Sequence, residues 1–223
     1  MKKIGMQTII MENLPYILET SSIVGPKEAA GPLAKYFDKC LEDEFWGEKT
    51  WEKAESKIIK ENVNALIAKS GIASSEIDYC FAGDLLNQCI SSSFGLRETN
   101  LPFFGIFGAC STFVEGLCLG SVFVDSGAAQ NVLCATSSHF CSAEKQFRFP
   151  LELGNQRPQS AQWTVTGSGA AILSNSNHGK ECPRITYVTP GKIVDMGVKD
   201  TNNMGAAMAP AALDTLVTQF KDT

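Results

Sequence analysis

Cys110 is the residue with the clearest chemical potential in this sequence of 223 residues. It stands in the run FGACST, between a strand expected at residues 103–107 and a helix expected at about 111–125. The unpaired N–H groups and the positive end of such a helix favour a thiolate, and they could also bind a carboxylate or an oxyanion. The alternative is a small buried side chain, the usual environment of a free cysteine. The sequence leaves both roles open.

His139 is the base that a nucleophilic Cys110 would need, because it follows the strand expected at residues 131–136. The other histidine, His178, lies in the polar run SNSNHGK and is expected to be exposed. A histidine after a strand is more often a hydrogen-bonded structural residue than a base. Ser137 and Ser138 precede His139, however, and the run TSSH forms a polar cluster at the end where α/β sheets bind ligands.

Two further segments could contact a ligand. Asp84, Asn87 and Gln88 follow a strand in GDLLNQ, although capping of the next helix is the simpler role for Asp84. The segment EKQFRFPLELGNQR, residues 144–157, could hold an anionic aromatic ligand, or it could form a surface hairpin or a dimer contact. Its cations and rings are Lys145, Arg148, Arg157, Phe147 and Phe149. The run GSGAA is followed by a strand rather than a helix, so it is not a nucleotide-binding loop.

The composition argues against several classes of partner and cofactor. Nineteen Lys and Arg against 24 Asp and Glu give a net charge of −5 without a basic cluster, so nucleic acid is not an expected partner. Eight cysteines occur without a C-x-x-C pair and with only two histidines, and we expect no metal site. We also expect no cofactor.

The N-terminal run MKKIGMQTII lacks the apolar core of a signal peptide, and no stretch reaches the ~20 apolar residues of a membrane helix. We therefore expect reduced thiols and a cytosolic chain that reaches a membrane only through partners.

The candidate residues need a framework of strands and helices to bring them together. Residues 1–24 alternate apolar and polar positions, which predicts one or two strands with a turn at 13–15. The apolar spacing of residues 51–69 predicts an amphipathic helix capped by Thr50 and ended by Gly71. Two Gly-Pro steps predict a structured loop at 25–38. Further strands are expected at 77–83, 131–136, 164–173 and 184–197, and a last helix at 206–220. This alternation is typical of the α/β class.

Seven motifs in order give the sequence a resemblance to a known family. They are GPKEAAGPLAKYFD, AGDLLNQ, FGACST, ATSSH, QFRFP, TVTGSGA and DMGVKDTNNMGAAMAPAA. The run GACSTFVEGLCLGS resembles the central buried helix of the thiolase superfamily, which carries the nucleophilic cysteine at its N-terminus. Together the motifs resemble a family of sporulation proteins within that superfamily, from about Gly5 onward.

The resemblance implies a thiolase-like α/β fold made of two related halves. Residues 1–180 would form a complete N-terminal half with the buried central helix, and residues 181–223 only the beginning of the C-terminal half. Full-length members would continue beyond Thr223, so the chain would be truncated at its C-terminus.

The same resemblance implies a binding function without catalysis. The ligand would be dipicolinic acid, pyridine-2,6-dicarboxylic acid, during its uptake into the developing spore. The implied partners are membrane proteins of the same operon and a second copy in a homodimer. The implied location is the cytoplasmic face of the developing spore, at the spore inner membrane. By motif position, the pocket residues are Asp84, Asn87, Cys110, Ser111, Ser137, Ser138 and His139.

The alternative is a cysteine-dependent acyltransferase or condensing enzyme with Cys110 as its catalytic residue and His139 as base. Enzymes of the superfamily draw their catalytic histidine from the second half of the fold, of which this chain would hold only the first strand and helix. The resemblance therefore favours binding over catalysis. A third possibility is a role in assembly alone.

Overall fold

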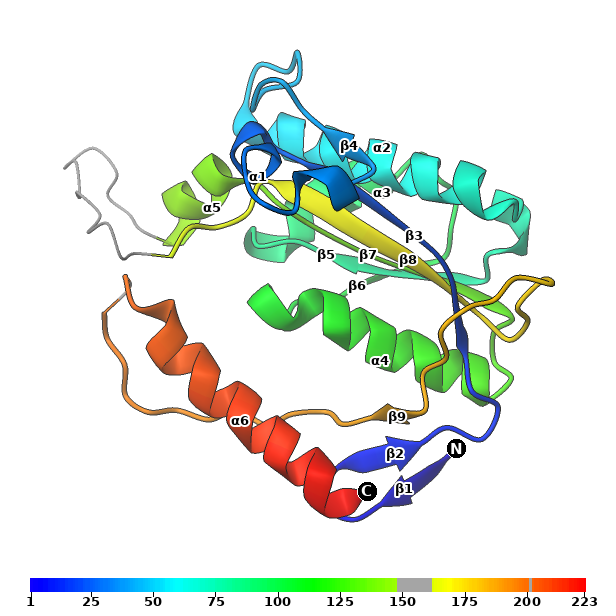
Figure 1. Ribbon diagram of the computed structural model, residues 1–223. Coiled ribbons are helices and arrows are strands. Elements are labelled where there is room, and N and C mark those ends of the chain that lie inside the picture. Colours follow the sequence, from blue (N-terminus) through cyan, green and yellow to red (C-terminus); the bar gives the residue numbers. More distant parts are fainter. Residues whose placement is uncertain (148–161, 201) are drawn as a thin grey trace.

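The computed structural model describes residues 1–147, 162–200 and 202–223, which form two sheets and the helices around them (Figure 1). Within these residues, the larger sheet has the strand order β4-β3-β8-β7-β5-β6 and the smaller has the order β1-β2-β9. The strands are β1 (Lys2–Ile4), β2 (Thr8–Ile10), β3 (Tyr16–Val24), β4 (Lys39–Cys40), β5 (Tyr79–Gly83), β6 (Phe103–Gly105), β7 (Asn131–Ser138), β8 (Gly167–Ser174) and β9 (Tyr187–Val188). The helices are α1 (Pro26–Ala29), α2 (Trp51–Ser70), α3 (Ile90–Leu96), α4 (Thr112–Asp125), α5 (Phe140–Phe147) and α6 (Met204–Asp222).

In the larger sheet, several strands begin or finish at the same end of the sheet. β5 runs parallel to both β6 and β7, so the loops that follow these three strands leave the sheet at the same end. β8 is antiparallel to β7, with Ser138 opposite Gly167 and Ser137 opposite Ser168, and therefore begins at that end. This arrangement positions the loops that contain Cys110 and His139 near each other, as the α/β pattern predicts.

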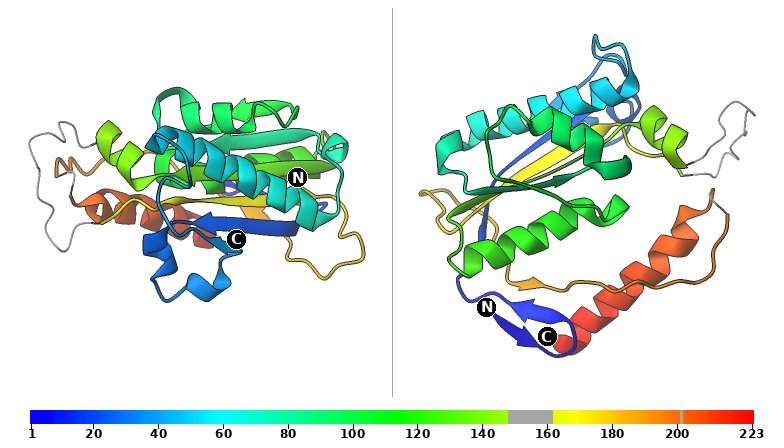
Figure 2. Two further views of the ribbon diagram at one scale, coloured as in Figure 1. Left: turned by 90° about the horizontal axis from the view of Figure 1, so that it is seen from above. Right: turned by 180° about the vertical axis from the view of Figure 1, so that it is seen from behind.

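Helices α2 and α3 cover one face of this sheet (Figure 2). The predicted cap and stop of α2 are confirmed: Thr50 Oγ1 accepts a hydrogen bond from Lys53 N–H at 3.3 Å, and Gly71 has φ +78°. The buried side of α2 packs on the inward side chains of β5, β7 and β8 in one apolar cluster. Two polar residues of α2, Glu55 and Asn62, are also fully buried against the sheet.

Helix α4 covers the opposite face of the sheet, and small residues allow it to approach closely. A Cβ atom at Gly120 would lie only 3.0 Å from Leu173 and 3.1 Å from Cys134 Sγ. The opposite side of the helix is open, with Val114 59% and Leu119 36% exposed. The expected buried central helix is therefore buried on one side only, because no described element packs closely over its outer side.

The smaller sheet pairs strands from the N-terminal part of the chain with a strand from its C-terminal part. β2 pairs with β9, with Ile9 opposite Val188, so residues 2–10 do not pair with the larger sheet. The expected strand at 184–197 is only the two residues of β9, and α6 follows it and lies beside the β1–β2 hairpin (Figure 1). None of the described helices has the length and apolar character needed to cross a membrane.

Candidate ligand-binding site

A cavity of about 960 Å³ lies beside the N-terminus of α4, at the end of β7 and the start of β8. Hydroxyl groups line part of it: Ser22, Thr136, Ser137, Ser138, Thr164 and Ser168. Large apolar side chains line the rest, among them Phe37, Phe113, Phe147, Trp163, Val165, Met204 and Met208. Such a lining suits a small ligand that has both an apolar surface and polar groups.

Cys110 lies at this cavity, and its side chain is exposed, which excludes the buried alternative. It stands in the 3₁₀ turn Ala109–Ser111 directly before α4. Thr112 fixes the turn, because its Oγ1 accepts from Gly108 N–H at 3.0 Å and donates to Ala109 O at 2.8 Å. Ala109 has φ +49°, a left-handed conformation that costs a residue with a Cβ about 1–2 kcal/mol. The fold therefore holds Cys110 in a defined position at the start of the helix.

His139 does not reach the cavity, although it follows β7 as predicted. Its side chain is fully buried, and Nε2 lies 2.9 Å from Glu44 O. Nδ1 accepts a hydrogen bond from Cys141 N–H at 3.2 Å, so Nε2 carries the proton and donates to Glu44 O. Both ring nitrogens are occupied by the backbone. The structure thus gives His139 the structural role and separates it from Cys110.

Asp84 and Asn87 are also not among the residues that line the cavity. The Asp84 carboxylate is buried and accepts from Leu86 N–H at 2.8 Å and from Ser92 N–H and Oγ at 2.7 and 2.6 Å. It therefore organises the loop between β5 and α3, as the capping interpretation predicts. Asn87 is exposed in a 3₁₀ turn of the same loop, Asn87–Cys89.

The predicted serines divide between the cavity and the turn. Ser137 and Ser138 line the cavity, whereas Ser111 Oγ donates to Gly108 O at 2.8 Å. Ser138 Oγ donates to Val165 O at 2.5 Å and so joins the end of β7 to the segment before β8. Of the motif residues, Cys110, Ser137 and Ser138 are the ones that the structure brings to the cavity.

Glu55 is an acidic residue near the site that the sequence analysis missed. Its carboxyl group accepts from Ser137 Oγ at 3.2 Å and from Ser142 Oγ at 2.7 Å, beneath the wall of the cavity. Burial raises the pKa of Glu55 to about 8, and the nearby carboxylate of Asp84 adds to the shift. The one indication in the sequence was that Glu55 is a charged residue on the otherwise apolar side of α2.

The aromatic and basic segment at 144–157 is described in part. Lys145 pairs with Glu52 at 3.1 Å on the surface, and Phe147 lines the cavity. Arg148, Phe149 and Arg157 lie outside the described residues. The predicted clamp for an anionic ligand stays a prediction.

Comparisons with known proteins agree on both family and fold. The family model described as stage V sporulation protein AD matches residues 5–223. Stage V sporulation protein AD of Bacillus subtilis (strain 168) is 42% identical over 222 residues, which are all of this chain but 65% of that protein. The chain thus spans less than two thirds of the length of this relative.

Solved structures of condensing enzymes share the fold at low identity. A variant of Xanthomonas campestris OleA matches with a TM-score of 0.61 and 13% identity, over 94% of this chain and 73% of that one. The 3-oxoacyl-(acyl carrier protein) synthase III of Xanthomonas oryzae matches with a TM-score of 0.58 and 13% identity, again over 94% and 73%. At this identity the likeness shows a thiolase-like fold and no more. Because the family model covers nearly the whole sequence, the chain belongs to the stage V sporulation protein AD family.

Proposed function

We propose that this protein binds dipicolinate without catalysis and serves its uptake into the developing spore. The observation that carries the proposal is the cavity at Cys110, which combines a helix N-terminus and hydroxyl groups with aromatic walls. A planar ring suits the apolar walls, and carboxylates suit the positive end of α4. Membership of a sporulation family supports the same proposal.

The absence of a base at Cys110 favours binding over catalysis. Among the described residues, those that line the cavity include no histidine, and Glu144 is their one carboxylate. His139, the base that acyl transfer would need, has both nitrogens occupied elsewhere. A nucleophilic cysteine normally requires a neighbouring base or cation.

Calorimetric titration of dipicolinate tests the proposal. Cys110→Trp should abolish the heat of binding, because the indole would occupy the part of the cavity next to the helix N-terminus and block the carboxylate from it. Cys40→Trp is the matched control, since Cys40 is also exposed but does not line the cavity. Absence of binding to the unmodified protein, or equal loss in both variants, would contradict the proposal.

The second candidate is acyl transfer by Cys110, and its exposure at the cavity is the observation in its favour. Catalysis would require a reactive thiolate. The rates of alkylation of Cys110 and Cys40 by iodoacetamide at pH 7 can be compared by peptide mass spectrometry. If Cys110 reacts more than about tenfold faster than Cys40, the enzyme interpretation gains support. Equal rates remove its basis.

The proposed partners follow from the same function. We infer membrane proteins of the same operon as the route by which the protein reaches the inner membrane of the developing spore, on its cytoplasmic face. We also infer a homodimer, and the net charge of −5 argues against a nucleic-acid partner. Fractionation of sporulating cells with and without the operon's membrane proteins tests the location.

A further inference from the structure

Helix α5 forms one wall of the cavity at Cys110. Three of its residues, Ala143, Glu144 and Phe147, line the cavity. The helix has eight residues and starts close to the end of β7 (Figure 1). So short a helix gains little stability from its own hydrogen bonds and depends on packing and on contacts at its ends. The side chains that hold the first turn of α5 therefore also hold this wall of the cavity.

His139 caps the first turn of α5. It is the one residue between β7 and α5, and its O accepts from Ala143 N–H at 2.9 Å, the first hydrogen bond of the helix. Its Nδ1 accepts from Cys141 N–H at 3.2 Å. The first N–H groups of a helix have no partner within it, and a side chain that accepts from one of them stabilises the helix. His139 thus takes the role that Ser, Asp or Asn more often has at the start of a helix.

The cap exists only while the imidazole of His139 is neutral. Its Nδ1 needs a lone pair to accept from Cys141 N–H, because its Nε2 already carries the proton donated to Glu44 O at 2.9 Å. A second proton would occupy Nδ1, so that two N–H groups would face each other. The ring would also place a positive charge at the positive end of α5. Because the side chain is fully buried, water cannot compensate for these changes.

The titratable groups around His139 come from three parts of the chain. Glu55 stays neutral below about pH 7, because burial raises its pKa to about 8. The hydrogen bond from Ser142 Oγ of α5 to Glu55, 2.7 Å long, is therefore the same at neutral and acidic pH. The groups are Glu44 from the loop before α2, Glu52 and Glu55 from α2, and Cys141, Glu144 and Lys145 from α5.

We propose that His139 is a pH-sensitive positioning residue, whose protonation releases the first turn of α5 and with it one wall of the cavity. Histidine is the side chain that ordinarily changes its charge between about pH 5 and 8. Ligand binding is therefore expected to be strongest at neutral pH and to weaken under mildly acidic conditions. The inference rests on the proposed function only for the ligand that reports the change, dipicolinate.

Hydrogen exchange of the amides of residues 141–147 at pH 7 and pH 5.5, corrected for their intrinsic rates, tests the cap. In the unmodified protein the corrected rates should rise about tenfold at pH 5.5. His139→Asn should remove this rise, because asparagine is a good N-cap and does not titrate. His178→Asn is the matched control, since the chain has two histidines and His178 is exposed in a turn. This variant should behave like the unmodified protein.

Calorimetric titration with dipicolinate at the same two pH values tests the effect on the cavity. The affinity should fall about tenfold at pH 5.5 in the unmodified protein and in His178→Asn, but not in His139→Asn. Protonation of the ligand itself would weaken binding equally in all three proteins. If His139→Asn does not fold, an NMR titration of the imidazoles of the unmodified protein takes its place. The midpoint for His139 should then coincide with the midpoint of the rise in exchange, and a separate midpoint would overturn the inference.

The outcomes separate this inference from the proposed function. If exchange in α5 does not rise at pH 5.5, or rises equally in all three proteins, the role of His139 is overturned while the proposed function stands. Equal affinity for dipicolinate at both pH values, despite faster exchange in α5, would also overturn it. If dipicolinate binds at neither pH but exchange depends on His139, the proposed function is overturned and the cap remains.

Discussion

Glu55 shows how a single buried residue can make the stability of this protein depend on pH. Its side chain is fully buried in α2, and its hydrogen-bond donors, Ser137 and Ser142, are neutral. Burial raises its pKa to about 8 from an ordinary value of 4.5, so the folded protein binds a proton that the unfolded chain releases above pH 4.5. The free energy of unfolding therefore falls as pH rises from about 4.5 to about 8 and loses no more above that range.

We expect Glu55→Gln to remove this dependence, because the amide keeps the shape and the hydrogen bonds but cannot ionise. Urea unfolding at pH 5.5, 7 and 8.5 should show the variant gaining stability relative to the unmodified protein as pH rises. The gain by pH 8.5 should be on the order of a few kcal/mol. Glu52→Gln is the control on the same helix, since Glu52 pairs with Lys145 at the surface. A constant difference between the two proteins across this range would contradict the assignment.

At the scale of single residues, the sequence predicted where a residue lies along a strand or helix better than it predicted which distant residues its side chain contacts. Cys110 was predictable at the start of a helix, because a strand, a turn and a helix follow each other locally. The role of His139 was left open, because its partner Glu44 is 95 residues away in the sequence. The contact of Lys27 with the ring of Trp163 was not predicted, because the two residues are 136 positions apart in the sequence.

Helix α4 depends on small residues to lie against the sheet. Gly120→Val should destabilise the protein by about 1–3 kcal/mol, because the new side chain would meet Leu173, Cys134 and Val132 within 3.1 Å. Denaturant unfolding measures the change. Gly205→Val in α6 is the matched control, since the nearest atom to its added Cβ is the flexible end of Gln162 at 3.3 Å. Similar losses in both variants would show that close packing is not the cause.

Helix α6 is attached to the β1–β2 hairpin by one carboxylate. Asp222 accepts hydrogen bonds from the N–H groups of Met6, Gln7 and Thr8 at 2.8, 2.9 and 3.0 Å, and these bonds lower its pKa to about 2. The attachment should thus be complete above about pH 4 and be lost as pH falls towards 2.

Asp222→Asn should release this end of α6 at neutral pH, because an amide offers a single acceptor oxygen in place of two. Hydrogen exchange of the three amides of residues 6–8 should become faster. Asp195→Asn is a suitable comparison, since Asp195 accepts a local hydrogen bond from Gly197 N–H, two residues away. Unchanged exchange in the Asp222 variant would mean that other contacts hold the helix.

At the scale of elements, regular periodicity was a reliable guide and isolated strands were not. The helix expected at 51–69 is Trp51–Ser70, because a long apolar stripe and its caps are local properties. The strand expected at 184–197 is only Tyr187–Val188, because a strand exists where another strand pairs with it. The pairing of β2 with β9 joins residues 177 or 179 positions apart, Ile10 with Tyr187 and Ile9 with Val188, which no local pattern indicates.

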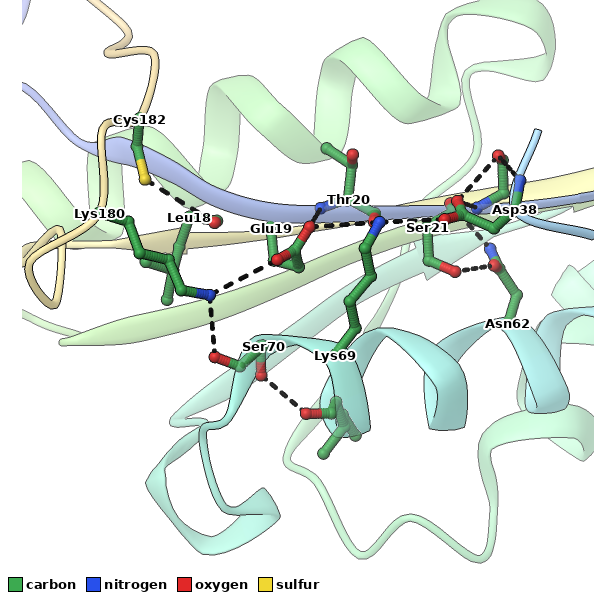
Figure 3. A network of polar contacts seen from close by, with 12 residues as sticks. Leu18, Glu19, Thr20, Ser21, Asp38, Asn62, Lys69, Ser70, Lys180 and Cys182 are labelled. Atoms are coloured by element: carbon green, nitrogen blue, oxygen red, sulfur yellow. Dashed lines mark hydrogen bonds and ion pairs between the residues drawn. The ribbon is translucent and has the colours of Figure 1, made fainter. Parts of the chain in front are cut away.

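At the scale of the whole molecule, the two edges of the larger sheet differ in how well their backbone groups are covered. Along β3, which β4 covers at only two residues, side chains satisfy the outward backbone groups (Figure 3). Lys69 Nζ donates to Thr20 O at 2.9 Å, and Asp38 Oδ2 accepts from Ser22 N–H at 2.9 Å. Charged side chains at an edge prevent the addition of another strand.

The opposite edge has no such protection among the described residues. No described strand lies beyond β6, and Phe103 and Phe104 are 39% and 43% exposed there. A short edge strand with apolar side chains can pair with the same strand of a second copy about a twofold axis. The proposed homodimer is therefore expected to form through β6 rather than through β3.

A charge placed on this edge tests the arrangement. Phe103→Lys should convert a dimer into a monomer, because two ammonium groups would meet across the twofold axis and each would lose its hydration. Phe94→Lys on α3 is the matched control, since Phe94 is 57% exposed and lines a hollow together with residues of α2 rather than of β6, and this variant should stay dimeric. Light scattering coupled to size-exclusion chromatography measures the mass of each species. If the unmodified protein is a monomer at about 100 μM, or if the Phe103 variant stays dimeric, β6 does not form the interface.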